Sequence, residues 1–181
     1  MINRIIGLLL LIYLSPFFLV IALIILIDDG FPIFFRQKRI GVDNIEFFIY
    51  KFRTMRKSIP DIPTHLVDGN QQLYTRIGPL FRKYSIDELP QLINIIKGDM
   101  IFIGPRPALY NQDDLIEFRT QAGIHTQLPG ITGWAQVNGR NAISWDEKFK
   151  LDVWYVENQS LWLDIKILFK TIPTVLKGTG Q

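Results

Sequence analysis

The sequence predicts a mainly helical α+β fold with one small β-hairpin, attached to a membrane through its N-terminal segment. Residues 5–27 form an apolar run with Ser15 and Pro16 at its middle. The run is long enough to cross a bilayer, for which about 20 apolar residues are needed. Downstream, two segments rich in β-branched and aromatic residues precede several stretches with helical periodicity. We therefore expect a membrane helix over residues 1–30 and a globular domain over residues 31–181.

Ser15 and Pro16 decide how the membrane helix is expected to run. Proline lacks an N–H and its ring clashes with a carbonyl one turn back, so it kinks or breaks a helix. The Ser15 hydroxyl is expected to bond back to the Leu11 carbonyl and to help satisfy the bend. A break at this position favours a re-entrant helix, which dips into the bilayer and returns to the same side. A plain span remains the alternative.

Charge and cysteine content narrow the class of protein. The chain has 20 Lys and Arg against 17 Asp and Glu, a net charge of +3, and its basic residues gather between positions 36 and 57. Basic residues directly after an apolar run suit anionic lipid headgroups, a phosphorylated substrate or a cytoplasmic flank, so we do not expect a nucleic-acid partner. The chain has no cysteine, which excludes disulfides and Cys-based zinc sites. The apolar run is also too long for a signal peptide.

The globular part begins with a predicted β-hairpin. Residues 33–35 and 45–52 are rich in aromatic and β-branched side chains and flank a turn at 41–44. Residues 58–72 are polar and hold two prolines, so we expect a loop there. Residues 76–83 predict a short helix.

The second half of the chain predicts four further helices. Residues 85–97 form the first, with a capping box between Ser85 and Glu88 and a stop at Gly98. Residues 107–122 form the second, before a Gly- and Pro-rich stretch at 128–141.

The third helix begins at a second capping box, Ser144 and Glu147. Residues 161–176 form the fourth, which is amphipathic. One apolar stripe of this helix holds Leu161, Ile165, Leu168 and Ile172. That stripe either lies in a membrane interface or packs on the core.

Asp87 and Glu88 are the leading candidates for chemistry. Adjacent carboxylates at a predicted helix start meet free N–H groups, which attract phosphate and keep carboxylates ionised. An ionised Asp can attack phosphorus, and a neighbouring carboxylate can hold Mg²⁺ against a pyrophosphate. The alternative is structural, because acidic residues are common in a first helical turn and Glu88 can simply complete the capping box.

Three further segments offer groups that suit a phosphorylated or nucleotide ligand. Residues 51–55 end the hairpin with two cations, residues 104–107 hold one Arg between prolines, and residues 136–141 are polar and glycine-bearing. Their alternatives are lipid contact, a surface Arg and plain turns. The candidate binding residues are Lys51, Arg53, Arg106, Gln136, Asn138 and Arg140.

Five blocks, taken in order, resemble the bacterial sugar transferase family, the monotopic phosphoglycosyl transferases. They are Ser15-Pro16 within the apolar run, KFRTM at 51–55, SIDELPQL at 85–92, GDMIFIGPRP at 98–107 and PGITGWAQVNGRN at 129–141. The blocks extend over nearly the whole chain. Its length and the stretch GRNAISW at 139–145 are similar to the small members that begin Campylobacter-type N-glycan assembly.

The resemblance implies a monotopic protein with a re-entrant helix over 1–30 and a cytoplasmic catalytic domain with interfacial helices over 31–181. It implies transfer of a sugar-1-phosphate from a UDP-sugar to undecaprenyl phosphate, with release of UMP and a need for Mg²⁺. Asp87 would be the nucleophile that forms a covalent phospho-sugar, and Glu88 its partner at the metal. Arg106 would contact phosphate, Arg140 would lie in the nucleotide-sugar region, and Ser15 and Pro16 would break the membrane helix.

The resemblance also places the protein at the cytoplasmic face of a bacterial inner membrane. Its expected partners are both substrates and membrane lipids, with downstream glycosyltransferases and a second copy of the chain as further candidates. The sugar expected from the subgroup is an N-acetylated amino or deoxyamino sugar. Two alternatives stay open: a non-catalytic, membrane-anchored interaction module, and a single-pass protein with its domain outside the cell.

Overall fold

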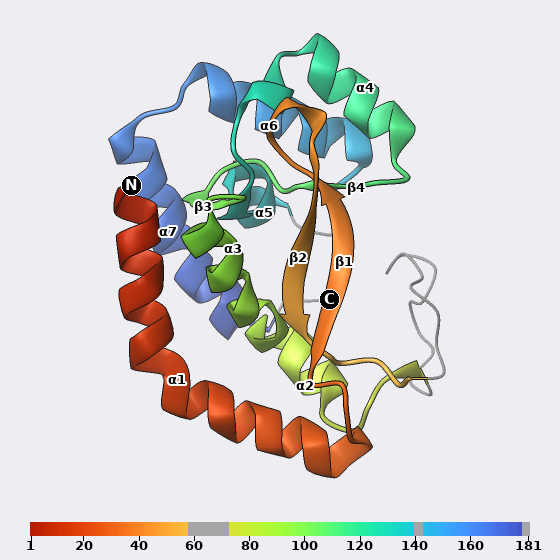
Figure 1. Cartoon of the computed structure of the whole chain (residues 1–181). Helices are drawn as coiled ribbons and strands as arrows, with labels where there is room; N and C mark the ends of the chain where they lie inside the picture. The colour runs from red at the N-terminus through yellow and green to blue at the C-terminus, as the bar shows by residue number, and fades with distance from the viewer. Residues whose placement is uncertain (58–72, 140–142, 179–181) are drawn as a thin grey trace.

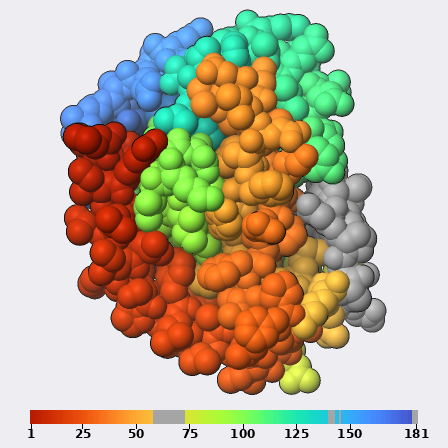
Figure 2. All heavy atoms as spheres, in the orientation of Figure 1, coloured from red at the N-terminus to blue at the C-terminus, as the bar shows by residue number. Residues whose placement is uncertain are grey.

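A long helix, α1 (Ile2–Asp29), begins the chain and bends sharply near its middle (Figure 1). The computed structural model describes residues 1–57, 73–139 and 143–178, so the loop expected over 58–72 lies outside the described part. The space-filling view shows α1 lying along one edge of the molecule beside α3 (Leu92–Lys97) (Figure 2). By length and composition α1 could cross a membrane, and 11% of its most apolar window is buried inside the molecule.

The Ser15-Pro16 pair lies at the middle of α1, as expected for a bend. The predicted acceptor for Ser15 is wrong, because its hydroxyl donates to the Ile12 carbonyl, at 2.7 Å, and not to that of Leu11. The reason is the proline itself. In a regular helix the N–H of residue 16 would bond to the carbonyl of Ile12, and Pro16 has no N–H. Ser15 therefore satisfies the carbonyl that its neighbour leaves unpaired.

Both ends of α1 are fastened to the globular part. At the C-terminal end the Arg53 guanidinium donates to the carbonyls of Asp29 and Gly30, at 3.1 and 2.6 Å, and pairs with the Asp29 carboxylate at 3.1 Å. At the N-terminal end the Arg4 guanidinium lies over Gly98, where any Cβ would collide with it. Gly98 ends α3 with a φ of 94°, a conformation that glycine adopts without strain.

The hairpin is confirmed. Strands β1 (Phe34–Ile40) and β2 (Glu46–Phe52) pair antiparallel around a short 3₁₀ turn, η1 (Val42–Asn44). A third strand, β4 (Ala108–Leu109), pairs with the other side of β1. A separate parallel pair joins β3 (Ile101–Ile103) to β5 (Gly130–Thr132). Strands of two or three residues leave no readable alternation in a sequence, so none of these three was expected.

The remaining described elements cover the sheets. They are α2 (Gly78–Lys83), the 3₁₀ segment η4 (Ile86–Gln91), α4 (Asp113–Gln121), the 3₁₀ segment η5 (Ile124–Thr126), α5 (Trp134–Asn138), α6 (Trp145–Glu157) and α7 (Leu161–Leu176). The core lies in three clusters. One joins α1 to the hairpin and α2, a second joins α3 to β2, and a third joins α6 to α7.

The helix expected over 85–97 is divided into η4 and α3, and its capping box is wrong. Ser85 has a φ of 54° and makes no capping hydrogen bond. Pro90 disfavours an α conformation at the residue before it, which suits a 3₁₀ segment here. Glu88 is held by cations of other elements and is not available to Ser85.

Of the next two predicted helices, one begins later than expected and the other begins as expected. The helix over 107–122 begins only at Asp113, because Ala108 and Leu109 pair with β1 and Arg39 donates to the Pro107 carbonyl at 3.1 Å. The capping box of Ser144 and Glu147 at the start of α6 is confirmed.

α7 is confirmed over 161–176. It packs through Leu163 and Ile167, while Leu161, Leu168 and Ile172 are exposed. The predicted apolar stripe is therefore not the face that packs on the core.

Asn94, in α3, closes the edge of β2. Its side-chain oxygen accepts from the Tyr50 N–H at 3.1 Å, and its amide donates to the Phe48 carbonyl at 2.7 Å and to Asp99 at 3.2 Å. The side chain is fully buried. It thus acts as a substitute for a further strand and holds α3 against the hairpin.

We predict that Asn94→Leu lowers the free energy of unfolding by about 2 kcal/mol or more, because it leaves a buried N–H and a buried carbonyl without partners. Thermal unfolding of the detergent-solubilised protein measures the change. The control is Gln121→Ala, which removes an exposed bond to Glu117 on α4 and should change stability by less than about 0.5 kcal/mol. Equal melting temperatures for the two variants would contradict the role of Asn94.

Candidate active site

Asp87 and Glu88 lie in the first turn of η4, and both carboxylates are largely buried. The left-handed Ser85 turns the chain into this segment, and Pro90 follows within it. The following residues run on into α3, which is fixed to the hairpin by Asn94. The pair is therefore carried on a short rigid segment between two anchored elements.

Glu88 is the centre of an ion cluster that joins three separate parts of the chain. Its Oε1 accepts from the Lys51 ammonium of β2 at 2.7 Å and from the Arg106 guanidinium at 2.9 Å. Asp87 has a longer contact, 3.9 Å, with the same Lys51. Both cations thus bind mainly to Glu88, and the Asp87 carboxylate is the less tightly paired of the two carboxylates.

The cluster drives the pKa values of the two carboxyl groups in opposite directions. Burial raises the pKa of Asp87 to about 6; Lys51 lowers it and Glu88 raises it. For Glu88, burial also opposes ionisation, but Arg106 and Lys51 outweigh it and hold the pKa of Glu88 below its usual range. At neutral pH Glu88 is firmly ionised, and Asp87 is ionised but more basic than an ordinary aspartate.

The pKa values of the two cations shift in opposite directions. Burial lowers the pKa of Lys51, although both carboxylates counter it. Glu88 raises the pKa of Arg106, which therefore stays charged. Lys148, in α6, lines the same cleft; burial and then the charge of Arg106 lower its pKa.

Close backbone packing positions the turn that carries Arg106. The Gly104 N–H donates to the Thr132 carbonyl and the Gly130 N–H to the Pro105 carbonyl, both at 2.9 Å. A Cβ at Gly104, Gly130 or Gly133 would fall on backbone atoms of the facing segment. These glycines let residues 104–107 lie directly on residues 128–133, so the two motifs form one rigid unit.

A cleft of about 1050 Å³ opens beside the dyad. Five of the predicted site residues line it together with Asp87, namely Lys51, Arg53, Glu88, Arg106 and Gln136. Gln136 donates its amide to the Ile131 carbonyl at 2.9 Å, and its buried Oε1 has no hydrogen-bond partner among the described residues. That oxygen is an acceptor at the edge of the cleft.

The remaining predicted residues lie elsewhere. Arg53 reaches the cleft wall, but its guanidinium is committed to the end of α1. Asn138 is not among the described residues that line the cleft; it bonds at the surface to the Trp134 carbonyl and to Lys170. Arg140 lies outside the described residues. Ser15 and Pro16 belong to α1 and do not line the cleft.

Sequence reasoning missed a buried ion pair in the same cleft. Arg119 of α4 donates to the Asp152 carboxylate of α6 at 2.7 Å, and both residues line the cleft. Burial raises the pKa of Asp152, against the effect of Arg119. An available signal was the position of Asp152 three residues after Phe149 and four before Val156, on the apolar face of that helix, where a solvated carboxylate is not expected.

The described residues include no group of three or more Asp, Glu, His or Cys side chains that could hold a metal ion by themselves. Asp87 and Glu88 nevertheless fit Mg²⁺ in its usual role with phosphorylated substrates, where one or two carboxylates hold it together with the phosphate oxygens. Any such site would be completed by the substrate.

The shifted pKa of Asp87 predicts the effect of Asp87→Asn on stability. A raised native-state pKa means that the ionised group costs stability above pH 6, so the variant should unfold at a higher temperature there. The gain should be about 1–3 kcal/mol at pH 8, should fade as the pH falls from 6 to about 4, and should be absent below that, where Asp87 is protonated in both states. Melting temperatures of both proteins across this range provide the test.

Glu88→Gln is the matched comparison and should have the opposite sign. It leaves Lys51 and Arg106 buried without their anion, which costs about 3 kcal/mol at neutral pH. If Asp87→Asn is less stable than the parent at pH 8, the raised pKa of Asp87 is wrong.

Comparisons with known proteins identify the family. The family model described as "Bacterial sugar transferase" matches residues 1–178. The uncharacterized sugar transferase EpsL of Bacillus subtilis is 52% identical over 151 residues, which are 83% of this chain and 73% of that protein.

Two relatives with more specific names cover less of their own length. The UDP-N-acetylgalactosamine-undecaprenyl-phosphate N-acetylgalactosaminephosphotransferase of Aeromonas hydrophila is 40% identical over 92% of this chain and 40% of its own. The undecaprenyl-phosphate galactose phosphotransferase of Salmonella typhimurium is 37% identical over 84% of this chain and 35% of its own. The chain therefore belongs to the bacterial sugar transferase family and is an enzyme, a phosphoglycosyl transferase.

Proposed function

We propose that this enzyme transfers a sugar-1-phosphate from a UDP-sugar to undecaprenyl phosphate, with Asp87 as the nucleophile. The observation that carries the proposal is the division of the dyad: Glu88 takes both cations, at 2.7 and 2.9 Å, and leaves Asp87 as the more basic carboxylate. A nucleophile needs an unshared electron pair at working pH, which Asp87 has above pH 6. Family membership removes the non-catalytic module as a competing account.

The reaction proceeds in two displacements at one phosphorus atom. A carboxylate oxygen of Asp87 attacks the phosphorus that bears the sugar, the bond to the bridging oxygen breaks, and UMP leaves. An oxygen of undecaprenyl phosphate then attacks the same phosphorus, the bond to Asp87 breaks, and the carboxylate is restored. The sugar phosphate passes to the lipid with no net change in the enzyme.

The surrounding residues supply charge and orientation. Lys51 and Arg106 are placed to attract the diphosphate, and Glu88 fixes both of them within the cleft. When bound at Asp87 and Glu88, Mg²⁺ would offset the repulsion between the carboxylates and the substrate phosphates. The donor sugar we favour is an N-acetylated amino or deoxyamino sugar, on the subgroup likeness of residues 139–145.

We further propose that α1 is a re-entrant membrane helix and that the domain lies at the cytoplasmic face. Three observations support this topology: α1 is apolar and largely exposed, it bends at its middle, and both of its ends are fastened to one globular part. A spanning helix would need its ends on opposite sides of the bilayer. The exposed apolar side chains of α7 suit the interface beside it.

We predict that purified enzyme releases about one equivalent of UMP from its UDP-sugar when Mg²⁺ is present and undecaprenyl phosphate is absent. A phospho-sugar adduct on Asp87 should accompany the burst and be visible by intact mass. Asp87→Asn should abolish both signals, because an amide cannot form the intermediate. Asp43→Asn, in the exposed hairpin turn, is the control and should behave as the parent.

Release of UMP only after undecaprenyl phosphate is added would show direct transfer in a ternary complex. Near-normal turnover by Asp87→Asn would remove Asp87 from the mechanism. Each result leaves the family assignment in place.

The topology predicts that single cysteines at Ile2 and at Asp43 react with a membrane-impermeant maleimide from the same side. The chain has no native cysteine, so each label reports one position. We expect both to react in inverted vesicles and neither in intact spheroplasts. Labelling of Ile2→Cys alone from outside would mean that α1 spans, and labelling of both from outside would place the domain outside the cell.

A further inference from the structure

The cleft does not end at the dyad but continues into an apolar arm. The arm is lined by Leu89 and Leu92, which follow the dyad in sequence, and by Leu10 and Leu14 of α1. The last turns of α7 contribute Thr174 and Val175. A single continuous space therefore runs from a buried carboxylate pair to the flanks of two apolar helices.

The arm is apolar even where its wall carries threonines. The Thr174 hydroxyl donates to the Lys170 carbonyl at 2.6 Å, and the Thr171 hydroxyl donates to that of Ile167 at 2.8 Å. Hydroxyls that are satisfied within their own helix place no unpaired polar group in the wall. The described charged residues that line the cleft, from Arg39 to Asp152, come from elements other than α1 and α7.

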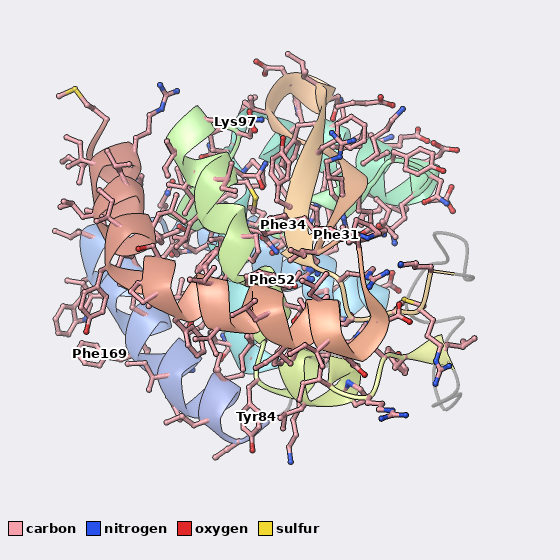
Figure 3. The ribbon with its side chains drawn as sticks, turned by 60° about the horizontal axis from the view of Figure 1, so that its bottom comes forward. Phe31, Phe34, Phe52, Tyr84, Lys97 and Phe169 are labelled. Carbon is pink, nitrogen blue, oxygen red and sulfur yellow. The ribbon has the colours of Figure 1, made fainter. Side chains whose placement is uncertain are left out.

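The two helices that flank the arm also present apolar side chains outward. Leu9 of α1 and Phe169 of α7 are 61% and 72% exposed. Figure 3 shows α1 and α7 on the same side of the molecule, with Phe169 projecting outward from α7. Tyr84 projects outward near the C-terminal end of α7 (Figure 3). Because Tyr84 also lines the cleft, the cleft reaches the surface near this end of α7.

We propose, building on the function proposed above, that this arm holds the first isoprene units of the polyprenyl phosphate acceptor. The acceptor must bring its phosphate to the phosphorus carried by Asp87 while its hydrocarbon stays out of water. Among the described residues the apolar arm offers both, since its lining continues from the dyad to two helices whose outer faces suit lipid. The rest of the chain then leaves between α1 and α7 into the bilayer.

The arm also separates the two substrates in space. The same cleft is also lined by Arg106, which bonds to Glu88 of the dyad, and by Lys148 and the Arg119–Asp152 pair, which suit a polar, anionic nucleotide-sugar. The lipid enters from the apolar side. Asp87 lines the same cleft as both sets of residues, as an enzyme requires when each substrate meets the same carboxylate in turn.

Cysteine protection tests the arm without using turnover. Leu10→Cys and Val175→Cys place a thiol in the wall, whereas Leu9→Cys and Leu176→Cys place one at a neighbouring exposed position outside it. All four are made in the Asp87→Asn background, so that the result does not depend on the nucleophile. The reagent is N-ethylmaleimide, and the probes are undecaprenyl phosphate and inorganic phosphate in detergent micelles.

We expect undecaprenyl phosphate to remove most of the labelling at positions 10 and 175 and to leave positions 9 and 176 unchanged. Inorganic phosphate should protect none of them. Equal labelling of the two wall positions with and without the lipid would overturn the proposal. Protection of all four positions would overturn it too, because the lipid would then be coating the helices without entering the arm.

A bulky substitution gives a second, kinetic test. Val175→Trp should raise the KM for undecaprenyl phosphate about tenfold, because the larger side chain would fill space that the isoprene units need and so displace their apolar contacts, which have effects of this size. Its KM for the UDP-sugar and its melting temperature should stay close to those of the control, Leu176→Trp. An unchanged acceptor KM in Val175→Trp would overturn the assignment of the arm, whereas failure of Asp87 as nucleophile would leave the protection result intact.

Discussion

The ion cluster around Glu88 is the interaction on which the rest of the site depends. It links the hairpin through Lys51, the dyad segment through Glu88 itself, and the proline-flanked turn through Arg106. A buried carboxylate that is held by two cations stays ionised, whereas burial, with a further contribution from Glu88, raises the pKa of Asp87 beside it. One cluster therefore sets the geometry of the cleft and also the difference between its two acidic residues.

The fold supplies the rigidity that such a cluster needs. Desolvated charges are favourable only when their partners are held in place. Here Asn94 fixes α3 to β2, and the glycine-lined contact between residues 104–107 and 128–133 fixes the Arg106 turn. The short strands β3, β4 and β5 contribute little area, but each of them ties a site segment to a neighbour.

Local signals in the sequence predicted those parts of the structure that local physics determines. The hairpin followed from its aromatic and β-branched segments, α6 from the capping box of Ser144, and α7 from its apolar period. The capping box predicted at Ser85 is wrong because two cations that are distant in sequence bind Glu88. Local sequence spacing cannot predict that Lys51 and Arg106 meet at this carboxylate. The Arg119–Asp152 pair was missed for the same reason, since its partners lie on separate helices.

The two fastened ends of α1 have a consequence for the proposed membrane topology. A free helix answers a thicker or thinner bilayer by tilting. A helix whose ends are held by Arg53 and beside Gly98 could not do so without distorting the domain that holds them. In the proposed topology its depth would then be set by the protein, and hydrophobic mismatch would be absorbed by the lipids around it. The dyad would keep one height above the hydrocarbon in membranes of different thickness.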